Sequence, residues 1–195
     1  LAQKLSSSRE KAADELSKKI TQSMHELNMP HGRFVINVEH DAEKKASRLG
    51  TDDIQFEVTT NPGQPLQSLS KVASGGELSR ISLAIQVMTA TQKSVPTMMF
   101  DEVDVGVSGP TAAIVGKMLR ELGQTAQVIC VTHLPQVAAK ADNQFQVSKY
   151  SDNDETETMV KALTHNERVT ELARLLGGDS VTDMAKANAK ELLAS

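Results

Sequence analysis

Small or apolar residues recur every three or four positions through the first 28 residues, and neither glycine nor proline interrupts them. This spacing predicts one long helix from Ala2 to about Asn28, which ends there because Pro30 disfavours helix in the residue before it. Its apolar stripe is thin and the remaining positions are mostly charged or polar, so the helix is expected to need a partner. The stripe consists of Leu5, Ala12, Leu16, Ile20, Ser23 and Leu27. We interpret residues 1–29 as the end of a coiled-coil arm whose other part lies outside this chain.

Two short runs then alternate apolar and polar residues, which is the pattern of half-buried strands. The first run carries Phe34, Ile36 and Val38, and the second carries Ile54, Phe56 and Val58. The segment between them is polar, and the stretch 61–65, with two prolines and a glycine, predicts a turn after the second strand.

A helix with apolar residues on nearly all sides is predicted from Ala73 to about Ala90, and it is expected to be well buried. Ser74 followed by Glu77 forms a capping box at its start. Ser74, Gly75 and Gly76 also have the character of an anion site, because helix N-termini present free N–H groups and glycines allow close approach. The alternative is a well-capped buried helix with no ligand.

Two short apolar runs, 97–100 and 127–131, flank a further helix that opens at Ser108–Pro110 and closes at Gly123. Strand, helix and strand at this spacing predict parallel strands joined by a right-handed crossover. The remainder predicts a short helix from about Pro135, two alternating strands around an acidic turn at 151–155, a helix capped by Thr164 and Glu167 that ends at 177–178, and a last helix over 181–193.

Composition narrows the class of protein. The 195 residues are 39% hydrophobic and 24% charged, which is typical of soluble globular chains. The net charge of −4 argues against a free-standing nucleic-acid binder. No apolar run is long enough to span a membrane and the first residues do not form a signal peptide, so a cytoplasmic location is expected. The single cysteine, Cys130, is interpreted as a small buried hydrophobe, with a reactive thiol as the alternative.

Both apolar strands of the middle region are followed by side chains that can bind ions or transfer protons. Asp101 and Glu102 follow the first strand, at the sheet edge where ligands of α/β folds bind. One acid there is suited to Mg²⁺ and the other to the attacking water of a phosphoryl transfer, although acid pairs also cap turns. His133 follows the second strand and can donate to a phosphate oxygen, or serve a structural role.

The order of these three elements resembles the C-terminal lobe of ABC-type ATPases. Residues 71–80 (KVASGGELSR) resemble the signature motif in its SMC-like form, residues 100–108 (FDEVDVGVS) resemble Walker B running into the D-loop, and residues 131–137 (VTHLPQV) resemble the histidine switch. Together with residues 60–64 (TNPGQ) and 171–178 (ELARLLGG), the sequences of these motifs are similar to those of the RecN-type SMC-like proteins.

The resemblance implies an α/β fold for residues 30–195: the C-terminal half of an ABC/SMC-type head, with a parallel-sheet core, flanking helices and β-hairpins. It implies that Asp101 serves Mg²⁺, that Glu102 is the catalytic base and that His133 senses the γ-phosphate of ATP. It further implies that Ser74, Gly75, Gly76 and Glu77 meet ATP held by a second head, and that Asp104 and Gly106 belong to the D-loop. Ser108 departs from the Asp that commonly ends SMC-like D-loops, and it is interpreted as a helix cap only.

No Walker A motif is present, because the only Gly-Lys pair, Gly116-Lys117, is followed by methionine within a predicted helix. The resemblance therefore implies a separate N-terminal lobe of the same protein that supplies the P-loop, a homodimer of heads, and action on DNA in double-strand break repair and recombination near the nucleoid. The isolated chain is expected to be inactive. The alternative is a non-catalytic dimerisation or scaffold module with a coiled-coil arm; a membrane-transport ATPase fits less well because the segment after the signature lacks a longer basic run.

Overall fold

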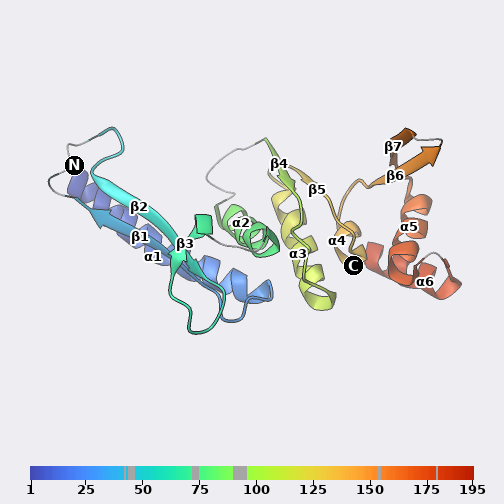
Figure 1. The fold of residues 1–195 in the computed structure, drawn as a ribbon, viewed down its shortest axis with the longest axis horizontal. Coiled ribbons are helices and arrows are strands. Elements are labelled where there is room, and N and C mark those ends of the chain that lie inside the picture. The colour runs from blue at the N-terminus through green and yellow to red at the C-terminus, as the bar shows by residue number, and fades with distance from the viewer. Residues whose placement is uncertain (42, 44–46, 72–74, 90–95, 153–154, 179) are drawn as a thin grey trace.

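The computed structural model describes residues 1–41, 43, 47–71, 75–89, 96–152, 155–178 and 180–195. Helices and strands succeed one another along an elongated molecule, with the N-terminal elements at one end and the C-terminal elements at the other (Figure 1). The helices are α1 (Ala2–Glu26), α2 (Gly75–Thr89), α3 (Gly109–Leu122), α4 (Pro135–Ala138), α5 (His165–Gly177) and α6 (Asp183–Ala194), with a 3₁₀ turn at Leu69–Lys71. The strands are β1 (Arg33–His40), β2 (Asp52–Thr59), β3 (Gln67–Ser68), β4 (Thr97–Phe100), β5 (Gln127–Cys130), β6 (Phe145–Asp152) and β7 (Glu155–Ala162).

Helix α1 lies along an antiparallel sheet of β1, β2 and β3. The helix forms where expected, but its buried face is not the predicted stripe: Leu5 and Ala12 are exposed, whereas Ser6 and Ala13 are buried. The stripe is correct from Ile20 onward, where the helix enters the main core. The first half is displaced by one position because it packs against a strand edge, which accepts small and polar side chains.

The contact between α1 and β1 is a ladder of polar side chains four residues apart. Ser17 Oγ accepts a hydrogen bond from the Ile36 N–H at 2.9 Å, and Thr21 Oγ1 accepts one from the Phe34 N–H at 3.0 Å. One turn further, His25 Nε2 lies 2.9 Å from the carbonyl oxygen of Gly32. These bonds satisfy backbone groups of an edge strand that would otherwise lack partners.

Strands β4 and β5 are parallel and in register from Thr97 opposite Gln127 to Phe100 opposite Cys130, as the strand–helix–strand pattern predicts. Helix α3 connects them. Helix α2 begins at Gly75 and packs on this unit, yet only one face is buried, with Ile81, Leu83 and Ala84. The expectation of all-round burial was wrong, since Leu78 is 40% exposed.

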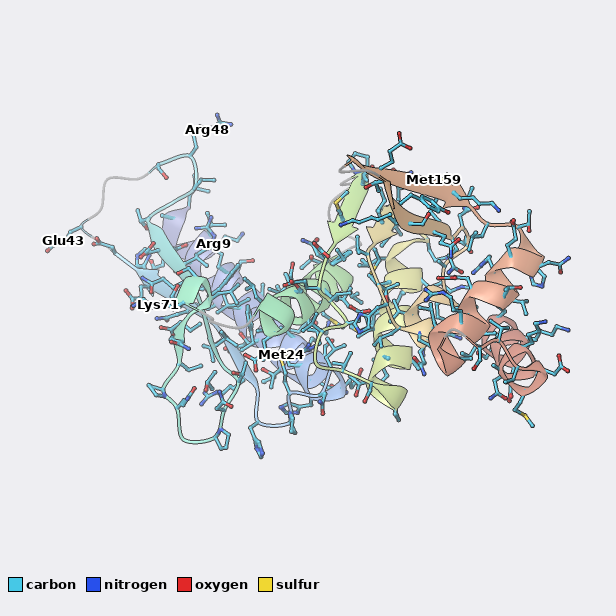
Figure 2. The ribbon with its side chains drawn as sticks, turned by 45° about the vertical axis from the view of Figure 1, so that its right-hand side comes forward. Arg9, Met24, Glu43, Arg48, Lys71 and Met159 are labelled. Atoms are coloured by element: carbon cyan, nitrogen blue, oxygen red, sulfur yellow. The ribbon has the colours of Figure 1, made fainter. Side chains whose placement is uncertain are left out.

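The main core contains side chains from α1, from the first hairpin (β1 and β2), and from α2, β4 and α3. Met24 of α1, labelled in Figure 2, is fully buried within it. A second, smaller core joins α4, α5 and α6. The predicted capping box of Thr164 and Glu167 is present at the start of α5. Helix α6 starts later than predicted, after its cap Thr182.

The β6–β7 hairpin pairs Phe145 with Ala162 and Val147 with Val160. Phe145, Val147 and Val160 are each 62% exposed, so one face of the hairpin presents apolar side chains to solvent. Within the described ranges, no helix has both the length and the apolar character that crossing a membrane requires.

Candidate nucleotide site at the carboxyl edge of β4 and β5

Asp101 and Glu102 emerge directly from the end of β4, and both are exposed. Asp101 Oδ1 accepts a hydrogen bond from the Glu102 N–H at 3.0 Å, and the Asp101 carbonyl accepts one from Ser79 Oγ of α2 at 3.1 Å. Asp101 therefore caps the turn, as the structural alternative predicts, while its carboxylate stays accessible to solvent.

Glu102 has a backbone φ of +57°, in the left-handed region that few non-glycine residues adopt. Such conformations cost energy and cluster at functional sites. The turn aims the Glu102 carboxylate at the start of α2: a Cβ placed on Gly75 would lie 2.8 Å from Glu102 Oε2. The structure thus brings together two of the three elements that the sequence singled out.

Gly76 allows α2 to approach the loop after Glu102. A Cβ at this position would lie 3.0 Å from the carbonyl oxygen of Val105 and 3.3 Å from its Cβ. Because the nearest obstacle is backbone, a side chain here would push α2 away from the loop. Gly106, in the same loop, has a φ of +74°, a backbone conformation that glycine adopts more easily than other residues.

Arg80 joins α2 to the same loop, and sequence reasoning gave it no role. Its guanidinium donates to the Val105 carbonyl at 2.5 Å, and the residue is only 6% exposed. Burial lowers the pKa of Arg80, an effect that the nearby Glu77 carboxylate opposes. The Glu77 side chain also accepts a hydrogen bond from Thr60 Oγ1 at 3.3 Å. The available signal was that Arg80 is the one basic residue between Gly75 and Thr89, the bounds of α2.

Asp104 connects this loop with the end of β5. Its carboxylate accepts hydrogen bonds from the Thr132 hydroxyl and from the His133 N–H, the latter at 3.2 Å. The imidazole of His133 lies beside it, with 3.5 Å between Nδ1 and Oδ2, and its side chain is 69% exposed. The loop from Glu102 is therefore in contact with both the start of α2 and the histidine.

Three further predictions concern single residues at this edge. Ser74 lies outside the described residues. Ser108 stands at the position that precedes α3, but its hydroxyl makes no capping hydrogen bond. Burial, followed by the carboxylates of Asp104 and Asp101, raises the pKa of Cys130 to about 12, which favours the inert thiol over the reactive alternative.

The residues present include one accessible carboxylate, that of Asp101, which suits a magnesium ion shared with a nucleotide. Among the described residues, no three His, Cys, Asp or Glu side chains converge as a metal-binding group. Magnesium in nucleotide enzymes needs only one or two carboxylates, because phosphates and water complete its shell. A single accessible carboxylate such as Asp101 fits that arrangement.

Comparison with known proteins finds relatives that align with nearly the whole chain. No family model matches the chain. The chain is 57% identical over 192 residues to the DNA repair protein RecN of Vibrio cholerae, and 51% identical over 189 residues to that of Haemophilus influenzae. These alignments cover 98% and 97% of the chain but 34% of each relative. The chain thus spans about a third of the length of the curated relatives that it matches.

Solved structures agree on the fold. An Smc head domain with a coiled coil and joint from Pyrococcus yayanosii matches 85% of the chain, and the chain covers 29% of that structure, with a TM-score of 0.59 and 21% identity. A chain from a study of ATP-driven dimerisation of SMC ATPases matches 90% of this chain and is itself 99% covered, with a TM-score of 0.52 and 18% identity. In sequence the chain matches a segment of the RecN DNA repair proteins over nearly its whole length, and its fold is that of the SMC head domains.

Proposed function

We propose that residues 30–195 form the C-terminal half of an SMC-like ATPase head that works in DNA double-strand break repair and recombination, with residues 1–29 as the end of a coiled-coil arm. The observation that carries this proposal is the convergence of the start of α2 and the end of β5 on the loop that follows β4. Gly75 meets Glu102, Arg80 holds Val105, and Asp104 holds His133. The names of the relatives support the role in DNA repair.

The residues at this edge divide the work of ATP hydrolysis. Asp101 would hold Mg²⁺ together with the nucleotide phosphates, and the ion would neutralise phosphate charge when bound. Glu102 would accept a proton from the attacking water, and His133 would donate to a phosphate oxygen. Ser74, Gly75, Gly76 and Glu77 would face the nucleotide held by a second head, with Asp104 and Gly106 in the D-loop between the two sites.

The missing phosphate cradle would come from an N-terminal lobe of the same protein. Two exposed apolar surfaces support such a partner. Met99 and Ile129 are opposite each other in β4 and β5 and are 71% and 42% exposed, and the β6–β7 hairpin exposes a second apolar face. Exposed apolar faces of this kind mark interaction sites. DNA would be engaged by the full-length assembly, in the cytoplasm and at the nucleoid.

The proposal is tested with Glu102→Gln in a longer protein that contains the P-loop lobe. This substitution keeps the size and hydrogen bonding of the side chain but removes the base. We expect ATP turnover to fall by about 10²–10⁴-fold while ATP binding is retained, because loss of a general base typically has that effect. Glu191→Gln, an exposed glutamate of α6, is the matched control and should leave turnover unchanged.

The competing function is a scaffold module that dimerises through the exposed apolar faces without catalysis. It predicts equal turnover in Glu102→Gln and Glu191→Gln. That result would show that Glu102 only shapes the turn after β4.

A further inference from the structure

Asp104 is a buried carboxylate whose position the roles above do not explain. It is 2% exposed, although burying a carboxylate is costly unless donors compensate its charge. Within the part of the chain that the structure describes, its ion-pair partner is the imidazole of His133, not a lysine or an arginine. The donors that surround it belong to two consecutive residues at the end of β5.

These donors all meet the same oxygen, Oδ2. The Thr132 hydroxyl and the His133 N–H donate to it, and His133 Nδ1 lies 3.5 Å away. Thr132 Oγ1 in turn accepts a hydrogen bond from the Leu134 N–H at 3.1 Å. One carboxylate oxygen therefore fixes the backbone that carries the histidine and also faces one nitrogen of its ring.

The consequence for the ring follows from imidazole chemistry. Which nitrogen carries the proton is set by the partner of the other nitrogen, and a carboxylate beside Nδ1 favours a proton there. The opposite nitrogen, Nε2, is then the atom that gains or loses the second proton. When both nitrogens are protonated, Nε2–H can donate to an anion while the carboxylate balances the ring charge.

We propose that Asp104 is a positioning residue for His133: it anchors the histidine backbone and keeps a proton on Nδ1, which leaves Nε2 as the ring atom that meets a phosphate oxygen. The exposure of the two groups suits this division, since the imidazole is 69% exposed and the Asp104 side chain is 2% exposed. The contact with phosphate rests on the proposed ATPase function, whereas the link between Asp104 and His133 does not.

The test reads the imidazole directly by ¹⁵N NMR of this chain at a pH of about 8, where histidines of ordinary pKa are mostly neutral. We expect His133 to be protonated mainly at Nδ1, while the exposed His31 shows the mixture of a free side chain. Asp104→Ala, which removes the acceptor facing Nδ1, should bring the pattern of His133 to that of His31. Thr132→Val removes the other donor but keeps the carboxylate, and it should preserve the Nδ1 proton.

A second measurement follows the His133 amide. Asp104→Ala should accelerate its hydrogen exchange on the order of tenfold or more, because a hydrogen bond to a carboxylate is lost. The Val131 amide, which donates to the Phe100 carbonyl, should not change. The proposal is overturned if wild-type His133 has the same proton distribution as His31, or if Asp104→Ala leaves that distribution unchanged. It is also overturned if the His133 amide exchanges equally fast in Asp104→Ala and in wild type. No nucleotide is needed, so these outcomes are independent of whether the chain serves an ATPase.

Discussion

At the scale of single residues, Asp52 ties the first hairpin to the long helix. Its side chain is 1% exposed and accepts hydrogen bonds from Arg9 of α1 at 2.6 Å and from His40 of β1, whose Nδ1 is 3.1 Å away. Arg9 is labelled in Figure 2, beside the hairpin. The hydrogen bond from Arg9, followed by that from His40, holds the pKa of Asp52 at about 2, below its ordinary value of 3.8.

This depressed pKa predicts acid sensitivity. Because the folded state binds the proton less readily than the unfolded state, Asp52 stabilises the fold fully above about pH 4, and this contribution is lost as the pH falls towards 2. Asp52→Asn should therefore be less stable than wild type at pH 7, and the gap should close as the pH falls through that window. Urea unfolding at a series of pH values measures it.

The neighbouring Asp53, which is exposed, provides the control: Asp53→Asn should track wild type closely. A gap between wild type and Asp52→Asn that stays constant from pH 7 to the acid limit would mean that the carboxylate charge does not stabilise the fold.

The residues of the candidate site differ in how far the sequence predicts them. Asp101, Glu102 and His133 are recognisable because each follows an apolar strand, and parallel strands end at one edge. The contacts of Arg80 and Asp104 are not recognisable in this way. Arg80 meets a backbone carbonyl and Asp104 meets a hydroxyl and an amide, and such partners leave no residue pattern in the sequence.

At the scale of elements, the ladder between α1 and β1 determines how the helix is held. Removing an acceptor leaves a backbone N–H without its partner, which costs about 1–3 kcal/mol when the group is buried. We expect Ser17→Ala to cost about 1 kcal/mol, at the low end of this range, because Ile36 is half-buried. Thr21→Val should cost more, since Phe34 is 2% exposed.

Ser8→Ala on the same helix is the matched control, because Ser8 is exposed and the change in helix propensity is the same as at position 17. Equilibrium unfolding in urea compares the three variants. If Ser17→Ala and Ser8→Ala are equally stable, the hydrogen bond to Ile36 contributes nothing to the free energy of unfolding.

Element positions follow from the sequence more reliably than element faces do. Periodicity and punctuation by proline and glycine predict α1, α2, both strands of the parallel pair and the capped α5. The predicted buried face of α1 is wrong in the first half of the helix, because the prediction assumed that an apolar surface covers it. The first half of α1 instead buries the small side chains of Ser6 and Ala13, which a pattern of large apolar residues does not reveal.

At the scale of the whole molecule, the chain contains the residues that we propose for hydrolysis but no P-loop motif to hold the nucleotide. A P-loop provides a cradle of backbone N–H groups and a lysine for the phosphates, and this sequence has neither. We expect calorimetry of the isolated chain with Mg-ATP to detect no binding tighter than about millimolar and no turnover. The longer protein with its P-loop lobe is the positive control, and micromolar binding by this chain alone would contradict the half-site proposal.

The ladder between α1 and β1 also limits how the helix can slide along the strand, because the two elements advance by different distances between successive contacts. Four residues of helix advance about 6.0 Å, whereas two residues of strand advance about 6.6–6.8 Å, so successive rungs drift by roughly 0.7 Å. Three successive contacts form despite this drift. The next pair in the series would be Ala13 with Val38, where the helix offers a methyl group and no hydrogen-bond acceptor. A slide of α1 by one turn would place Ala13 opposite Ile36 and break a rung. The three polar side chains, with an alanine at the next position, therefore give the helix one preferred position along the strand.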